Sequence, residues 1–530
     1  MRFVIAGVLM LAAVCAAAHV RSESGLCFDE PKRIASSFTM LEHAAFASRD
    51  GTPLSIVYGL PFSADERSIA RGWDPTAVRA NFSIWERGLE LLSDSGPPDA
   101  LVRARLPSVF VFLVLLVLIA WEGHRLAGPS GCVVAVALVG TSPALLSHAG
   151  LASPDLLATT ASVAFAIALR AFVAHGGAAR GVVVAVLAGL TIAAKLTCVA
   201  ILASACVALL IPKHRDWRCF AGAIAACAIG VVLAELGYRG FGSSLREPIG
   251  AARSFCGSAL STYFLGTFGD PGPWFYPVIT FGKATPLLLG ALVLAPFVLA
   301  FQRASRPAAS AAWIAYGLPA LGLLGGLVLS DFAQGYRFVL PAFALLALTV
   351  TPTFARVFDS PARGVRALAA FALLAQAIAT GAAHPDHLAY WNVFVGGFDG
   401  GSRIAVDSNA DWGQATPALL RYAEAERLDT VFALLNTIEP THAPLVGLPA
   451  LAWQLATAAP LEHSAIAVST TYVRMAEIDA ARSSNPLLEF VRALNAVPPQ
   501  ATPGHAIHVW RFTPEVEALA REHLGKYLQR

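Results

Sequence analysis

Two carboxylates, Asp29 and Glu30, stand side by side about ten residues after the first long apolar segment of the chain. An ionised carboxylate within hydrogen-bond reach of a hydroxyl can take up its proton, so this pair is a candidate general base. A structural role is equally open. Pro31 follows the pair, and Ile34 and Phe38 recur at helical spacing, which is typical of a helix capped by Asp29. The two roles are compatible, because a carboxylate fixed at a helix start is also a positioned base.

A second candidate carboxylate, Asp155, has the same two interpretations. It follows Ser153 and Pro154, an order typical of a helix start, so capping is the default role. His148 lies in the same short segment. Acidic residues are rare beside apolar membrane segments, and two of them on one membrane face favour a functional site.

Several cations stand next to apolar segments at the same predicted level. Lys195 lies in a turn between two such segments, Lys283 precedes one and Arg337 precedes another. Each of them alone is explained by a long side chain reaching from a helix end to the membrane surface. Together they indicate an anion site, and a lipid phosphate would suit it because the lipid tail can lie between helices.

The elements that must position these residues belong to a membrane protein. Of the 530 residues, 56% are hydrophobic and 14% are charged, which leaves too few polar side chains to cover a soluble globule. A membrane-spanning helix needs roughly 20 apolar residues. About eleven segments qualify: 3–19, 106–122, 128–147, 156–174, 180–194, 196–212, 217–238, 285–302, 308–329, 338–355 and 364–383.

Basic residues separate the loops into two sets. Arginines and lysines gather in alternate short loops, among them those near Arg125, Arg170 and Arg303, and such loops are cytoplasmic by the positive-inside rule. The loops 20–105 and 239–284 then face outward. The first segment is either a retained helix or a cleaved signal, and in both cases the pair at Asp29 lies outside.

The composition changes after residue 383. Runs at 403–407, 430–435, 465–469 and 505–510 predict strands, and 415–427 and 485–495 predict helices. We therefore expect a mostly α fold, a polytopic helical membrane protein with about 11 transmembrane helices in residues 1–383. A small extracytoplasmic α/β domain should follow in residues 384–530.

Charge and cysteine content bound the partners. The net charge of +3 comes from basic residues dispersed over loop ends, so a nucleic-acid partner is set aside. Cys27 and Cys256 are both expected outside, where an oxidising compartment permits a disulfide. No ligand cluster has metal spacing, so no metal is expected to be required, although adjacent Asp29 and Glu30 leave a divalent cation open.

A series of motifs follows in order along the chain. Asp29 and Glu30 come first, and the later members are residues 105–108, 142–148 with Asp155, 189–197, 266–276 with 283–286, 335–341, 384–392 and 407–414. Up to about residue 415 this series resembles the C-type, polyprenyl-phosphate-dependent glycosyltransferases, which include dolichyl-phosphate-mannose protein mannosyltransferases and lipid A aminoarabinose transferases. The final motifs are similar to a bacterial branch. Two positions depart from the pattern: Phe338 stands where tyrosine is usual and Pro154 where threonine is more common.

The resemblance implies an inverting transfer of a hexosyl or pentosyl group from a polyprenyl-phosphate donor to a hydroxyl of a protein, lipid or glycan, at the outer face of the bacterial inner membrane. It makes Asp29 the base, with Glu30 and Asp155 as further catalytic residues. Physical reasoning assigns the donor phosphate to cations, because a departing phosphate gains negative charge in the transition state. Arg337, Lys283 and Lys195 are the candidates. Candidate contacts to sugar or acceptor are His148, Asp411 and Trp412.

Two other classes of function stay open beside the enzyme. A secondary transporter of an anionic or lipid-linked solute would also place charges near the membrane faces, but it usually has inverted repeats and polar breaks at mid-bilayer. A membrane scaffold or sensor with an extracytoplasmic domain gives no reason for acids and cations on one face. The enzyme is therefore favoured.

Overall fold

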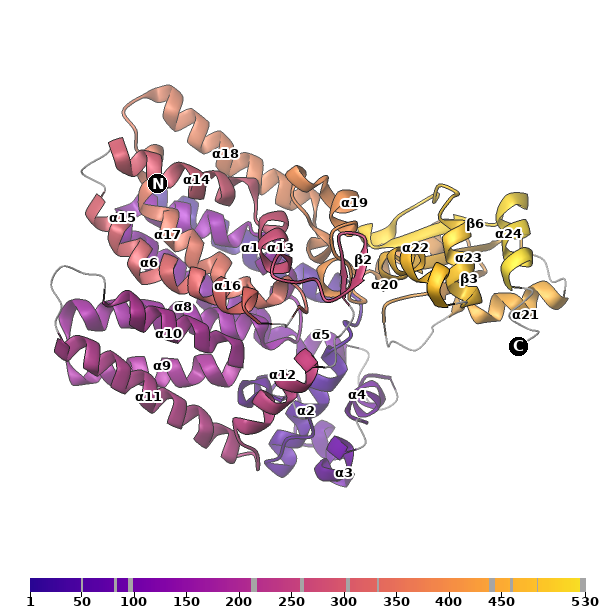
Figure 1. The fold of residues 1–530 in the computed structure, drawn as a ribbon, viewed down its shortest axis with the longest axis horizontal. Coiled ribbons are helices and arrows are strands. Elements are labelled where there is room, and N and C mark those ends of the chain that lie inside the picture. Colours follow the sequence, from indigo (N-terminus) through magenta and orange to yellow (C-terminus); the bar gives the residue numbers. More distant parts are fainter. Residues whose placement is uncertain are drawn as a thin grey trace.

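A computed structural model describes a helical bundle with a smaller α/β part at one end (Figure 1). The described residues are 1–48, 51–80, 83–93, 99–210, 217–257, 262–301, 306–330, 333–437, 444–457, 461–483 and 485–524. For some residues next to the gaps between these ranges, the structure describes the backbone alone.

Seven helical segments in the described residues are long and apolar enough to cross a membrane, or eight if one sharply bent pair is a single span. The polytopic helical fold expected from composition is therefore confirmed. The seven segments are α1 (Arg2–Glu23), α6 (Leu106–Gly140, counted from Ala100), α8 (Pro154–His175), α11 (Trp217–Arg239), α15 to α16 (Pro307–Val328), α17 (Leu340–Phe358) and α18 (Arg363–Ala382).

The expected count of eleven differs from seven for local reasons. Two expected spans fall within α6, whose backbone leaves helical geometry at Ala127 and Gly128. A Cβ on Gly131 would lie 2.2 Å from the carbonyl oxygen of Gly123, whereas eight residues along a straight helix are about 12 Å apart. The chain therefore turns back on itself at Gly128, so that α6 is a hairpin of two antiparallel helices.

The remaining expected segments are helical but short or bent. α9 (Ala178–Ala194) and α10 (Val199–Ala208) are apolar and shorter than a full span. α13 (Phe275–Lys283) meets α14 (Pro286–Phe301) at a bend of 107°, measured to Phe297. The break at Thr285 and Pro286 is expected, because proline cannot continue a helix without losing a backbone hydrogen bond.

Helix α17 is the centre of the bundle, because 89% of its most apolar 18-residue stretch is buried. It packs against α6, α8, α14 and α16. By contrast, only 17 to 22% of the corresponding stretches of α1, α11 and α18 is buried. These helices expose large apolar side chains such as Leu11, Val232 and Phe371. Such faces are suited to contact lipid.

The helices between α1 and α6 form a small layer, here called the N-terminal layer, with its own apolar core around Phe38, Phe62 and Trp73. Its elements are α2 (Glu30–His43), η1 (Pro53–Gly59), η2 (Glu66–Gly72), α3 (Pro75–Ala80), α4 (Ile84–Ser93) and α5 (Ala100–Ala104). The segment between α11 and α13 contributes α12 (Arg246–Gly257) and the hairpin of β1 (Thr262–Phe264) and β2 (Thr267–Gly269).

The C-terminal part is built on a four-stranded sheet in the order β4-β3-β5-β6. The strand β3 (Thr430–Leu434) runs parallel to β4 (Leu445–Gly447) and β5 (Ser464–Ser469), and β6 (Ile507–Arg511) is antiparallel to β5. Its helices are α20 (Thr416–Ala425), α21 (Pro449–Thr457), α22 (Thr470–Ser483), α23 (Pro486–Leu494) and α24 (Pro514–Leu524).

The prediction of a strand at 403–407 is wrong. Only Ala405 forms a bridge there, to Phe264, and a 3₁₀ turn, η9 (Asp407–Asn409), follows. The physical reason is that this segment packs on the bundle: the Ile404 carbonyl accepts from Leu265, and the Asn409 carbonyl accepts from Lys283. Three short elements precede it on the same surface, namely η7 (His387–Ala389), η8 (Val393–Val395) and α19 (Gly397–Ser402).

Candidate functional site

A cavity of about 570 Å³ lies where the N-terminal layer, the helix ends of the bundle and the segment before the sheet meet. Among the described residues, four acidic and four basic side chains line this cavity. The acids are Asp29, Glu30, Asp155 and Asp407, and the cations are Lys32, Arg33, Lys195 and Arg337. The structure therefore brings together six of the residues expected from the sequence: Asp29, Glu30, Asp155, Lys195, Arg337 and Trp412.

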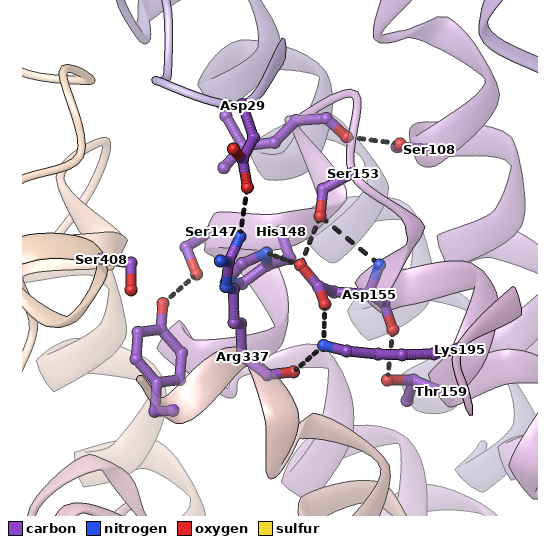
Figure 2. A network of polar contacts seen from close by, with 12 residues as sticks. Asp29, Ser108, Ser147, His148, Ser153, Asp155, Thr159, Lys195, Arg337 and Ser408 are labelled. Atoms are coloured by element: carbon purple, nitrogen blue, oxygen red, sulfur yellow. Dashed lines mark hydrogen bonds and ion pairs between the residues drawn. The ribbon is translucent and has the colours of Figure 1, made fainter. Parts of the chain in front are cut away.

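Asp29 begins α2 but does not cap it through its side chain. Its Oδ2 accepts a hydrogen bond of 2.8 Å from Nη1 of Arg337, and its Oδ1 lies 3.7 Å from Nζ of Lys32 (Figure 2 shows the first contact). Burial opposes the charge, but Lys32, Arg337 and Arg33 outweigh it and lower the pKa of Asp29 to about 2. The carboxylate is thus ionised and turned toward the cavity.

Asp155 also leaves the capping role to a neighbour. The hydroxyl of Ser153 accepts from the backbone N–H of Asp155 at the start of α8. The Asp155 carboxylate instead receives Nζ of Lys195 and the Ser153 hydroxyl. Lys195 leaves α9 in an extended conformation, so its side chain points across the cavity floor toward Asp155 and the Arg337 carbonyl (Figure 2).

Arg337 is positioned by an unusual backbone. It lies in η6 (Tyr336–Phe338), after Gly335, whose φ of 112° is readily adopted only by glycine. A Cβ at Gly335 would lie 2.5 Å from Oγ of Ser408, so a larger residue would displace that hydroxyl from the Gln334 carbonyl. The guanidinium lies 4.5 Å from the ring of Trp412 and pairs with Asp29. These contacts fix the Arg337 guanidinium beside the candidate base, Asp29.

Glu30 borders the cavity, yet its side chain is only 1% exposed. Its oxygens accept from Nε and Nη2 of Arg105 at 2.8 and 2.5 Å and from the backbone N–H groups of Cys27 and Ala152 at 2.9 and 2.8 Å. Arg105 also donates from Nη1 and Nη2 to the backbone carbonyls of Arg21, Ser24 and Gly25. The pair joins the segment of Asp29 to the loop before Asp155, which is a positioning role.

Three expected residues lie away from the cavity lining. Nζ of Lys283 is buried and donates to the carbonyls of Leu388, Tyr390 and Asn409 at 2.9, 2.6 and 2.5 Å. The carboxylate of Asp411 is also buried. It accepts from the Ser469 hydroxyl and the Gly413 N–H, and burial raises its pKa to about 6.

His148 is the third of these residues, and its side chain is 1% exposed. Burial lowers its pKa to about 4, so the ring is neutral near pH 7. Its Nδ1 lies 3.6 Å from Oδ2 of Asp155, and its ring packs against Tyr336 and Trp412. Trp412 itself reaches the cavity lining.

Several charged residues in or beside the cavity were absent from the expected set. Lys32 and Arg33 follow Asp29 by one helical turn, and that spacing was the available signal. Arg105 stood in one of the ordered motifs without an assigned role. Asp407 opened another motif, but nothing in its neighbourhood in sequence indicated that it would reach the cavity.

Two further expectations concern a metal ion at Asp29 and Glu30 and a disulfide between Cys27 and Cys256. Among the described residues, no group of three or more His, Cys, Asp or Glu is arranged to hold a metal ion. Glu30 also turns away from Asp29 toward Arg105, so the adjacent acids do not form a chelate. Cys27 is a buried free thiol, and the side chain of Cys256 lies outside the described residues.

Comparison with known proteins gives similarity to solved structures alone: no family model and no curated protein matches the chain. One structure is ArnT from Cupriavidus metallidurans bound to undecaprenyl phosphate, with 14% identity and a TM-score of 0.46 over 88% of this chain and 94% of that one. Another is the same protein in the apo state, with 12% identity and a TM-score of 0.44 over 97% and 98%.

Proposed function

We propose that the protein is an inverting glycosyltransferase that moves a sugar from a polyprenyl-phosphate donor to an acceptor hydroxyl. One observation carries the proposal: a single cavity at the ends of membrane helices holds a carboxylate, Asp29, paired with a phosphate-suited guanidinium, Arg337. Asp155 and Lys195 form a second such pair in the same cavity.

The donor phosphate is bound by Arg337 and Lys195 in this proposal. Breaking the anomeric bond converts a phosphodiester with one negative charge into a monoester that approaches two, so fixed cations stabilise the transition state more than the bound substrate. Both cations are held by carboxylates in the structure. The arriving phosphate takes over part of that pairing. Lys283 is assigned to holding backbone carbonyls, since its amino group has three such acceptors.

Asp29 is the proposed general base. The acceptor oxygen forms a bond to the anomeric carbon as the bond to the phosphate oxygen breaks on the opposite side, and the hydroxyl proton passes to Asp29. A carboxylate whose pKa is about 2 is a weak base. When Arg337 turns to the phosphate, it withdraws one of the charges that lower this pKa, so donor binding makes Asp29 more basic.

The geometry of α6 supports a site on the outer face. Ser108, at its start, donates to the Leu151 carbonyl beside the cavity, whereas Arg125 lies at the hairpin turn. These residues are 17 positions apart along one helix arm, about 26 Å, which is close to the hydrocarbon thickness. If the basic loop is cytoplasmic, the cavity opens outside, at the outer surface of the inner membrane.

Release of free polyprenyl phosphate tests the proposal. Purified full-length protein should convert polyprenyl-phosphate-linked sugar to free polyprenyl phosphate only when cell-envelope acceptors are added. A transporter would move the lipid without cleaving it, and a scaffold would do neither. Absence of acceptor-dependent release across lipid-linked hexoses and pentoses would contradict the assignment.

The acceptor is then identified from the product. A deletion strain should lack one glycosylated species, and mass spectrometry of its glycolipids, glycoproteins and envelope glycans reveals which class carries the sugar. Restoration of that species by the wild-type gene, but not by an Asp29→Asn gene, connects the product to this site.

A further inference from the structure

One acid of the cavity wall differs from the other three. Asp29, Glu30 and Asp155 are each ion-paired, with Arg337, Arg105 and Lys195. Asp407 lines the same cavity and is exposed to it, but no Lys, Arg or His of the described residues lies within 4.0 Å of its carboxylate. Its side-chain partner there is the amide of Asn436, 3.3 Å from Oδ1.

The backbone at Asp407 is left-handed. Its φ is 56°, in a region that residues other than glycine, asparagine and aspartate seldom adopt. The Asp407 carbonyl accepts from the N–H groups of Ala410 and Asp411 at 2.8 and 2.9 Å, and its own N–H donates to Oγ1 of Thr471 at 3.1 Å. These bonds hold the turn that presents the Asp407 side chain to the cavity.

The turn that carries Asp407 is tied to the segment of Arg337. Ser408 donates to the Gln334 carbonyl at 2.8 Å, and the side-chain oxygen of Asn409 accepts from the Tyr336 N–H at 2.9 Å. These bonds join η9 to η6, so the carboxylate and the guanidinium occupy a fixed relative position in one cavity. An anion bound by Arg337 therefore has Asp407 as a neighbour.

Charge decides what Asp407 can contact. A carboxylate repels a phosphate, so its favourable contacts with the donor lipid are to neutral groups. A carboxylate enclosed by a ligand also needs hydrogen-bond donors beyond the Asn436 amide. Burial already raises the pKa of Asp407. Sugar hydroxyls supply neutral donors, and Thr471, Tyr263 and Trp412 border the same cavity with polar and aromatic groups.

We infer that Asp407 binds the transferred sugar, with its carboxylate accepting hydrogen bonds from ring hydroxyls, and thereby helps to select the sugar. This inference rests on the proposed function, since it requires a glycosylated lipid phosphate in the cavity. It assigns phosphate binding and sugar recognition to different groups: Arg337 and Lys195 hold the phosphate, and the η9 turn recognises the sugar.

Two substitutions test this role without disturbing the turn. Asparagine and glycine both accept the left-handed backbone, so Asp407→Asn and Asp407→Gly should fold like the wild-type protein. The affinity of each purified full-length protein is measured for undecaprenyl phosphate and for undecaprenyl phosphate carrying mannose, glucose, galactose or arabinose. The wild-type protein should prefer one of the glycosylated lipids over the others.

Both variants should lose that preference roughly ten- to hundredfold, the effect of removing a hydrogen bond to a charged group, while affinity for bare undecaprenyl phosphate stays unchanged. Asp399→Asn is the matched control, because Asp399 is an exposed acid on α19 outside the cavity lining. It should behave like the wild-type protein in every measurement.

Three results overturn the inference alone: an unchanged preference in the Asp407 variants, no sugar preference in the wild-type protein, or an equal loss of affinity for bare and glycosylated lipid. Failure of the wild-type protein to bind any polyprenyl phosphate overturns the proposed function as well. The bare lipid therefore distinguishes the two failures.

Discussion

At the scale of single residues, four carboxylates around one cavity differ in their partners. Asp29 shares a surface-accessible pair with Arg337, Asp155 is closed off by Lys195 and Ser153, and Glu30 is buried against Arg105. Asp407 has no cation partner among the described residues. The partner of each acid, more than its residue type, indicates whether it can meet a substrate.

Replacement of Asp29 by asparagine should lower the rate constant of transfer roughly a hundred- to ten-thousandfold, because the amide cannot accept the hydroxyl proton. The variant should still fold and insert, with a lower melting temperature because Arg337 and Lys32 lose their charged partner. Turnover of a lipid-linked sugar measures the loss of transfer. Asp65→Asn, which changes an exposed acid of the N-terminal layer, is the control. Near-normal turnover by Asp29→Asn would remove Asp29 from the base role.

The pH profile should differ between kcat and kcat/KM. In the free protein the pKa of Asp29 is about 2, so kcat/KM should have no acid limb from this group above about pH 3. In the donor complex, Arg337 turns to the phosphate and the pKa moves toward the ordinary value of about 4. The acid limb of kcat should therefore lie at higher pH. Coincident limbs would argue against the exchange of Arg337.

Glu30→Gln separates positioning from catalysis. The amide would place an N–H group against donors and leave the Arg105 charge buried without its partner, which costs roughly 3–5 kcal/mol. A lowered melting temperature in detergent is expected, together with loss of transfer. A variant with wild-type melting temperature and lost turnover would instead return Glu30 to a catalytic role.

At the scale of elements, breaks in helices place the chemistry. The α6 hairpin returns the chain to the side of the cavity, the end of α9 extends Lys195, and the short η6 after Gly335 presents Arg337. Each break occurs where glycine or an extended residue interrupts a helix. Regular helices position these residues, and the interruptions direct their side chains.

Gly131→Ala tests the close approach within α6. The added Cβ would lie 2.2 Å from the Gly123 carbonyl oxygen, so the two arms must separate at a cost of about 1–3 kcal/mol. Thermal unfolding of the purified protein measures it. Gly364→Ala, in α18, meets nothing within 4 Å and should be neutral or slightly stabilising. Equal behaviour of both variants would contradict the tight hairpin.

At the scale of the whole molecule, the cavity exists only because three parts meet. The bundle supplies Lys195 and Asp155, the N-terminal layer supplies Asp29, and the segment before the sheet supplies Asp407 and Trp412. Lys283 holds the last of these parts on the bundle through three carbonyls. Loss of this contact should open the cavity from the side of the sheet.

Lys283→Met should therefore increase hydrogen exchange in residues 384–410 and lower the melting temperature, since each buried carbonyl left without a donor costs about 1–3 kcal/mol. Donor binding should weaken in parallel. Arg356→Met is the control, because Arg356 is an exposed cation at the far end of α17, and it should leave exchange and binding unchanged. Weakened donor binding with unchanged exchange in Lys283→Met would make Lys283 a phosphate ligand instead.

The sequence by itself determined the class of protein and most of its candidate residues. Composition and apolar runs depend on local residue type alone, so the polytopic helical fold and three of the four expected strands in the C-terminal part followed directly. Ordered motifs singled out Asp29, Asp155, Lys195 and Arg337, and all four line one cavity.

Only the tertiary structure decided what each charge faces. Lys283 and Lys195 are indistinguishable as lysines beside apolar helices, yet one is enclosed by backbone carbonyls and the other reaches Asp155. Glu30, expected to take part in catalysis, is buried against Arg105. The burial and the ion pairing of a side chain arise from contacts between segments up to hundreds of residues apart, such as Arg337 with Asp29. The local sequence pattern around a residue does not indicate these contacts.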